Sequence, residues 1–153
     1  MTADALGSAA VQPTAYAGFW RRVGAYLIDG LILGIVFVPL ALAVAPDPTT
    51  GAPAQSSAAA NAVNAVSTLV GWLYFAFMES SGRQATLGKM ALGIVVTDLE
   101  GNRIGFGRAT ARYFAKLLSF LILAIGVIMV AFTAKKQGLH DMIASTLVVK
   151  RAG

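Results

Sequence analysis

Asp29 is the residue whose position most clearly suggests chemistry, because it is the only charged residue between Val23 and Val44. A carboxylate in such an apolar stretch costs about 2.5–3.5 kcal/mol to insert at the centre of a bilayer. Arg22 precedes it by seven residues, which is two helical turns and nearly the same helix face. The pattern supports two interpretations of Asp29: an ion- or proton-binding carboxylate, or a structural ion pair that fixes helix packing.

A second polar pair, His140 and Asp141, follows the last long apolar stretch and the basic pair Lys135–Lys136. A histidine beside a carboxylate is able to shuttle protons, and such a pair also tethers turns at a membrane edge; we favour the structural role. The chain has one His and no Cys. This excludes multi-histidine metal sites, thiolate ligands and disulfides, so we expect no metal, no cofactor and no enzyme activity.

The composition indicates a membrane protein. Of the 153 residues, 57% are hydrophobic and only 12% are charged, whereas a soluble domain carries about a quarter of charged residues. The same hydrophobicity argues against a disordered chain. The net charge of +5 is typical of Lys and Arg placed beside anionic lipid on the cytoplasmic side, and nothing supports nucleic-acid binding.

The expected fold class is an all-α membrane protein, a small helical bundle with two spanning helices, a third apolar segment and a small cytoplasmic β element. We expect a disordered tail at 1–17 and one membrane domain at 18–151. Helix one is predicted over 22–44, an external loop over 45–60 and helix two over 61–79, where the loop is rich in Pro and Ala and lacks Lys and Arg.

The second half of the chain mixes polar and apolar elements. Residues 80–106 are predicted to be a cytoplasmic strand and turn region, in which 92–97 form a strand, 98–102 a turn, and 104–106 a returning hairpin strand. An amphipathic helix and the third apolar segment follow at 107–135, and a turn and a strand at 136–151. Because isolated strands need partners, 92–97 and 146–149 are predicted to pair.

The distribution of Lys and Arg predicts the topology. Two lie at the start of helix one, at positions 21 and 22, none lie in the 45–60 loop, six lie in 80–116 and four follow residue 134. The positive-inside rule therefore places the loop outside and the N-terminus inside. The third apolar segment, residues 117–134, either crosses once or forms a re-entrant hairpin broken near Gly126. We favour the hairpin, which puts both strands and the C-terminus on the cytoplasmic side.

These elements predict a polar cluster of Arg22, Asp29 and Asp141 at the cytoplasmic edge of the bundle. Two carboxylates around one guanidinium would leave a net negative site, suited to a proton or a small cation. Three further residues are candidates to support this cluster: Glu79, Arg112 and His140.

Four segments resemble the RDD family of bacterial membrane proteins, which is named for one Arg and two Asp. They read AGFWRRVGAYLIDGLIL, TLGKMALGIVVTDLEGNRIGF, RATARYFAKLL and KKQGLHDMIASTLVVK. The resemblance maps the family residues onto Arg22, Asp29 and Asp141, with Arg21 as the alternative to Arg22. It implies transport, with cation–proton antiport as the activity of some members.

Two functions follow from these observations. The first is a small transporter that exchanges a cation for protons and works as a homo-oligomer or with a membrane partner, because two or three spans enclose no pathway alone. The second is a non-catalytic accessory, assembly or lipid-interacting protein with a structural Arg/Asp network. Either would lie in the inner (plasma) membrane, in contact with the bilayer and with anionic headgroups at its cytoplasmic face.

Overall fold

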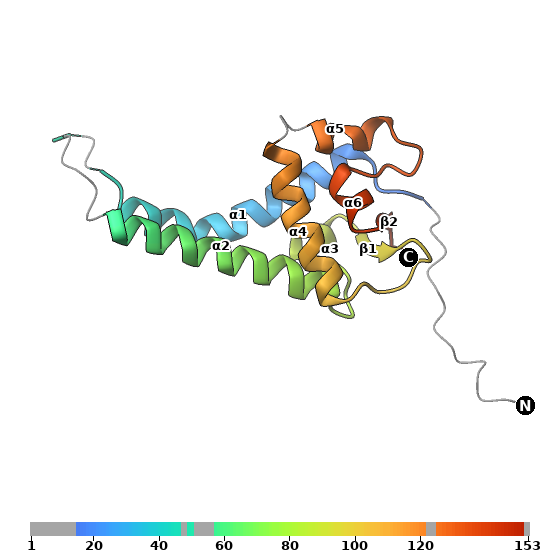
Figure 1. Cartoon of the computed structure of the whole chain (residues 1–153), viewed down its shortest axis with the longest axis horizontal. Helices are drawn as coiled ribbons and strands as arrows, with labels where there is room; N and C mark the ends of the chain where they lie inside the picture. Colours follow the sequence, from blue (N-terminus) through green and yellow to red (C-terminus); the bar gives the residue numbers. More distant parts are fainter. Residues whose placement is uncertain (1–14, 47–48, 51–56, 122–124, 152–153) are drawn as a thin grey trace, which may run out of the picture.

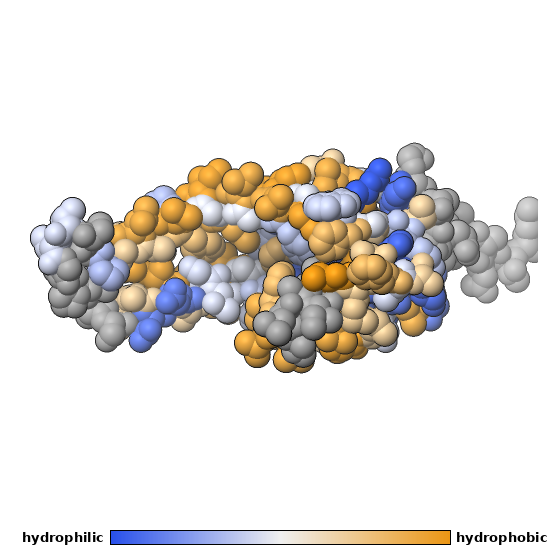
Figure 2. Space-filling model, turned by 90° about the horizontal axis from the view of Figure 1, so that it is seen from above, coloured by the Kyte–Doolittle hydropathy of each residue, from blue (hydrophilic) through white to orange (hydrophobic). Residues whose placement is uncertain are grey.

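Two long helices dominate the structure. The computed structural model describes residues 15–46, 49–50, 57–121 and 125–151. Helices α1 (Phe19–Ala43) and α2 (Ser57–Ser80) run side by side and project from a compact group formed by the other elements (Figure 1). Both are long and apolar enough to cross a membrane, and only 11% of each apolar window is buried within the chain. Apolar side chains line the upper side of this projecting part in the view of Figure 2, and more polar residues lie along its lower side.

The two predicted spans are therefore present as candidate membrane helices, with shifted ends. Helix one was expected from residue 22, and α1 begins at Phe19. Helix two was expected from residue 61, and α2 begins at Ser57, inside the segment predicted to be loop. The run of Ala at 58–60 explains this extension, because Ala has the highest helix propensity and no Gly or Pro follows residue 53 before the span.

The third apolar segment is divided between two shorter helices. Helix α4 (Phe106–Leu121) has 16 residues and α5 (Ile125–Phe132) has eight, and residues 122–124 between them lie outside the described part of the chain. Neither helix reaches the roughly 20 residues that cross a bilayer. Gly126, where the break was predicted, lies in the first turn of α5.

Strands β1 (Ile94–Asp98) and β2 (Thr146–Lys150) form an antiparallel pair, in which Val96 lies opposite Val148. This confirms the predicted pairing of 92–97 with 146–149. The predicted return strand at 104–106 is wrong, because Phe106 already begins α4. Ile104 instead packs with Ile94 and Val96 in the core, so the chain after the turn covers a face of the sheet and does not extend its edge.

Both edges of this small sheet are covered, which protects its unpaired backbone groups. On the β2 side, the Ala17 nitrogen donates to the Val148 oxygen at 2.8 Å and the Lys150 nitrogen donates to the Ala15 oxygen at 2.9 Å. On the β1 side, the Val96 nitrogen donates to the Gln84 oxygen at 2.7 Å. Residues 15–17 are thus ordered, which corrects the predicted tail at 1–17; residues 1–14 lie outside the described part.

Each strand is preceded by a five-residue helix that the sequence analysis did not predict. Helix α3 (Leu87–Ala91) leads into β1 and α6 (Leu139–Ile143) leads into β2. Both connections are two residues long, and the second residue has a positive φ, 63° at Gly93 and 50° at Ser145. The two helix–strand units therefore have the same layout; α3 packs against α1, whereas α6 packs mainly against α4.

Candidate functional site

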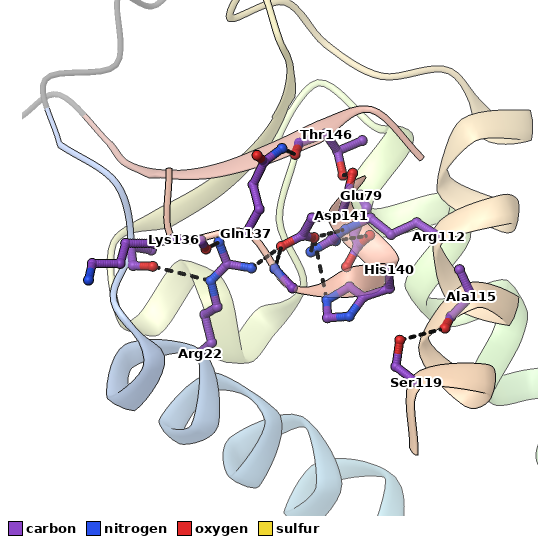
Figure 3. A network of polar contacts seen from close by, with 12 residues as sticks. Arg22, Glu79, Arg112, Ala115, Ser119, Lys136, Gln137, His140, Asp141 and Thr146 are labelled. Atoms are coloured by element: carbon purple, nitrogen blue, oxygen red, sulfur yellow. Dashed lines mark hydrogen bonds and ion pairs between the residues drawn. The ribbon is translucent and has the colours of Figure 1, made fainter. Parts of the chain in front are cut away.

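Arg22 and Asp141 form the contact between α1 and α6. One guanidinium nitrogen of Arg22, Nη1, pairs with Asp141 Oδ2, and both residues are almost fully buried. Arg22 also donates from Nε to the Ala17 oxygen at 3.2 Å. Its Nη2 donates to the Lys136 oxygen (Figure 3). Arg21 is exposed, so the buried arginine of this segment is Arg22.

Arg112 lies at the centre of the site and has no exposed surface. Its Nε donates to Asp141 Oδ1 at 2.8 Å and its Nη1 donates to Glu79 Oε2 at 2.6 Å. One guanidinium thus joins a carboxylate of α6 to a carboxylate of α2 through charge-assisted hydrogen bonds, which are stronger than bonds between neutral groups. Figure 3 shows both carboxylates turned toward it.

Lys89 completes the chain of ion pairs. Its Nζ pairs with the remaining Glu79 oxygen, Oε1, and only 1% of the residue is exposed. The connected residues, called the ion-pair network below, come from five helices, α1, α6, α4, α2 and α3; they are Arg22, Asp141, Arg112, Glu79 and Lys89. Burial alone would raise the pKa of Asp141, but the guanidiniums of Arg112 and Arg22 outweigh burial and hold this pKa far below its ordinary value.

Lys116 lies beside the network but is held differently. Its Nζ lies 4.6 Å from the ring centre of Tyr26 and 4.5 Å from that of Phe75. These two rings are called the aromatic clamp below. Lys89 Nζ faces the same rings at 5.4 and 5.8 Å. Burial lowers the pKa of Lys116 to about 8, although the nearby Glu79 carboxylate acts in the opposite direction.

His140 is buried next to Asp141, with 2% of its surface exposed. Its Nε2 lies 3.4 Å from Asp141 Oδ1, and neither ring nitrogen has a hydrogen-bond partner among the described residues. Burial lowers the pKa of His140 to about 3, and the Asp141 charge only partly offsets this effect. The imidazole is therefore neutral at physiological pH.

Asp29 is not part of this network. It accepts hydrogen bonds from the Tyr74 hydroxyl at 2.8 Å, from Thr86 Oγ1 at 2.6 Å and from the Gly88 nitrogen at 2.8 Å. These contacts attach α3 to α1. A Cβ at Gly88 would lie 2.1 Å from the Ala25 oxygen, so only glycine allows α3 to approach α1 this closely.

The predicted cluster is thus partly reproduced. The structure joins Arg22 to Asp141, brings Glu79 and Arg112 into the same network and places His140 beside it, whereas Asp29 has its own set of donors. The predicted net negative charge is wrong, because three network cations meet two carboxylates. The excess cation is Lys89, which the sequence analysis did not select.

Three further residues of the site were also missed: Tyr74, Thr86 and Lys116. The segment Thr86–Lys89 carried the one available signal, since it places a helix-capping Thr, a Gly and a Lys together. Among the described residues, no group of three or more His, Asp or Glu side chains is placed to hold a metal ion. Ion pairs and hydrogen bonds between the described side chains build the site.

Comparison with known proteins gives a consistent set of relatives. The RDD family model matches residues 16–145. The uncharacterized protein YxaI of Bacillus subtilis is 38% identical over 146 residues, which cover 87% of this chain and 96% of that protein. The uncharacterized membrane protein YteJ of the same organism is 38% identical over 145 residues, 88% of this chain and 81% of its own length. No solved structure shows significant similarity.

Proposed function

The chain belongs to the RDD family of membrane proteins, and we propose that it is a non-catalytic accessory protein of the inner membrane. In this proposal, the ion-pair network is structural. It holds a polar head, made of the sheet and the short helices, against two spanning helices. The head then presents a fixed surface to lipid headgroups or to a membrane partner.

One observation carries this proposal: the buried carboxylates are already occupied by donors of the protein. Asp29 accepts three hydrogen bonds. Asp141 is held by Arg22 and Arg112, and both oxygens of Glu79 are paired. A transported cation would have to displace these donors and would meet a net positive network, which is unfavourable in a low-dielectric site.

The long helices need such a network because they bury little of their own surface. Only 11% of each apolar window is buried within the chain, so packing between α1 and α2 contributes little to their placement. A buried ion pair is costly to break once formed, at about 3–5 kcal/mol. The network therefore supplies the fixed geometry that packing between the spans does not.

The topology of the proposal is an inner-membrane protein with both termini in the cytoplasm and α4 and α5 as the two arms of a re-entrant hairpin. The absence of Lys and Arg from 45–60 supports an external loop. The antiparallel pairing of β1 and β2 supports the hairpin, because it joins the residues before α4 to those after α5. Single-cysteine labelling at Ser145 and at Ser56 tests this topology; labelling of both from the outside would contradict it.

The expected partners are the bilayer and its anionic headgroups. Exposed cations surround the polar end of the molecule on several elements: Arg21, Arg83, Arg103, Arg108, Lys135 and Arg151. Basic side chains near a membrane surface each gain about 1 kcal/mol from anionic lipid. Exposed apolar residues on α4, such as Phe120 and Leu121, are available to lipid or to a second membrane chain.

Cation–proton antiport is the second candidate, favoured by the complete burial of Asp29 on a spanning helix. The test reconstitutes the wild-type protein in liposomes with a pH gradient and adds sodium or potassium. The accessory proposal expects the gradient to decay as in empty liposomes. Cation-driven decay that a folded Asp29→Asn variant abolishes would overturn it and establish antiport, and a variant at exposed Asn64, Asn64→Ala, is the control.

A further inference from the structure

We infer that Lys116 is a proton-exchange site of this protein, independent of the accessory role proposed above. Its side chain lies in the aromatic clamp beside a surplus of buried cations, and it releases and takes up a proton while the ion-pair network keeps its charges. In the exchange, the ammonium loses one proton to water and becomes a neutral amine, and no other bond changes.

The first observation is how Lys116 is held. It is 8% exposed, and its Nζ has aromatic faces at 4.5 and 4.6 Å, but no oxygen among the described residues accepts a hydrogen bond from it. Lys89, which faces the same two rings, has Glu79 Oε1 as its partner. Ring faces attract a cation more weakly than a carboxylate does in a buried site, so the charge of Lys116 is the less well compensated of the two.

The second observation is the charge that surrounds it. Lys116 adds a fourth cation to the three of the network, which holds two carboxylates. Among the described residues, the further carboxylate that acts on Lys116 is Asp29, which belongs to the separate set of hydrogen bonds with Tyr74, Thr86 and Gly88. A buried like charge disfavours the protonated form of a lysine. The titratable or charged groups that face Lys116 come from α1, α2, α3, α6 and α4 itself; they are Tyr26, Asp29, Glu79, Lys89, Arg112, His140 and Asp141.

The third observation is that the other buried cations are poorly suited to lose a proton and so reduce the excess positive charge. Guanidiniums do not lose a proton in proteins, which removes Arg22 and Arg112. His140 is already neutral. Burial lowers the pKa of Lys89 too, but Glu79 pairs with its Nζ and favours the charged form, a partner that Lys116 lacks. Burial also lowers the pKa of Lys116 to about 8, close enough to physiological pH for both forms to be present.

The test follows the lysine side chains directly by NMR. The protein is labelled with carbon-13 at lysine Cε, placed in lipid nanodiscs and titrated from about pH 6 to about pH 11. The resonance lost in Lys116→Arg should titrate with a midpoint near 8. The matched control is the resonance lost in Lys135→Arg, an exposed lysine, whose midpoint should be near the ordinary value of about 10.4.

Two results would overturn the inference. The first is a Lys116 midpoint equal to that of Lys135. The second is a midpoint that rises by a unit or more when inorganic phosphate replaces chloride at equal ionic strength, because a bound anion would then compensate the surplus charge.

A second measurement, the pH dependence of the melting temperature, tests the inference even if the Lys116→Arg variant does not fold. Because the folded pKa of Lys116 lies below its unfolded value, the unfolded chain binds more protons between about pH 8 and about pH 10, and the melting temperature should rise with pH in that range. The rise should be smaller in Lys116→Met, which keeps the length of the side chain and removes the titrating group. An equal rise in both proteins would contradict the inference.

Discussion

Replacing Arg112 by methionine is expected to destabilise the protein more than any change at an exposed cation. Arg112 has no exposed surface and bonds Asp141 at 2.8 Å and Glu79 at 2.6 Å. Its removal leaves each carboxylate with one cation, Arg22 or Lys89. Since neither carboxylate loses all its cationic partners, the loss of unfolding free energy should fall near the lower end of the range for a broken buried pair, about 3 kcal/mol.

The assay is thermal unfolding in detergent, followed by the intrinsic fluorescence of Trp20 and Trp72. For a chain of this size, about 3 kcal/mol corresponds to a fall in melting temperature of about 6–12 °C. The control is Arg108→Met, one helical turn earlier on α4 and exposed, which should change stability by no more than about 0.5 kcal/mol. If the Arg112 and Arg108 variants melt at the same temperature, the reasoning about the network is wrong.

Three further predictions concern the backbone and acid pH. Gly88→Ala should destabilise by more than about 3 kcal/mol or prevent folding, since its Cβ would meet the Ala25 oxygen at 2.1 Å; membrane yield and melting temperature measure this. Ser145→Gly should stabilise by up to about 1 kcal/mol, because Ser145 has a φ of 50°; an unchanged melting temperature would count against this explanation. Acidification from about pH 7 to about pH 4.5 should lower the free energy of unfolding by about 2 kcal/mol through His140. Its pKa of about 3 lies below the unfolded value of 6.5, so only the unfolded chain gains the proton in this range. The His140→Gln variant should lose less stability over the same pH range.

The parts of the fold that the sequence predicted correctly are those with a strong local pattern, such as a long apolar segment or a β-branched run. Apolar length predicted both candidate spans, and β-branched residues predicted the pairing of β1 with β2. The short helices α3 and α6 were not predictable by periodicity, because five residues make little more than one turn. The return strand at 104–106 failed because the turn after β1 resembles a hairpin turn locally, whereas the buried position of Ile104 is set by tertiary packing.

The candidate site was likewise predicted only in part. Charge within an apolar segment singled out Asp29, and its seven-residue spacing from Arg22 suggested one shared cluster. In the structure, α3 supplies Thr86 and Gly88 as donors to Asp29, whereas α6 supplies Asp141 to Arg22. Which carboxylate meets which cation depends on two short helices whose position was not predicted. Lys116 was not selected as a site residue because its partners are aromatic faces, which leave no charge pattern in the sequence.

The most direct test of the structural network is a double-mutant cycle between Arg22 and Asp141, in which the free energy of unfolding is measured in detergent. The cycle compares Arg22→Met, Asp141→Asn and the double variant with the wild type, and uses Arg21→Met with Asp141→Asn as the control pair. Direct contact in a buried network predicts a coupling of about 1–3 kcal/mol for Arg22 with Asp141 and none beyond about 0.5 kcal/mol for Arg21. Strictly additive effects at Arg22 and Asp141 would contradict the claim that this ion pair holds α6 to α1.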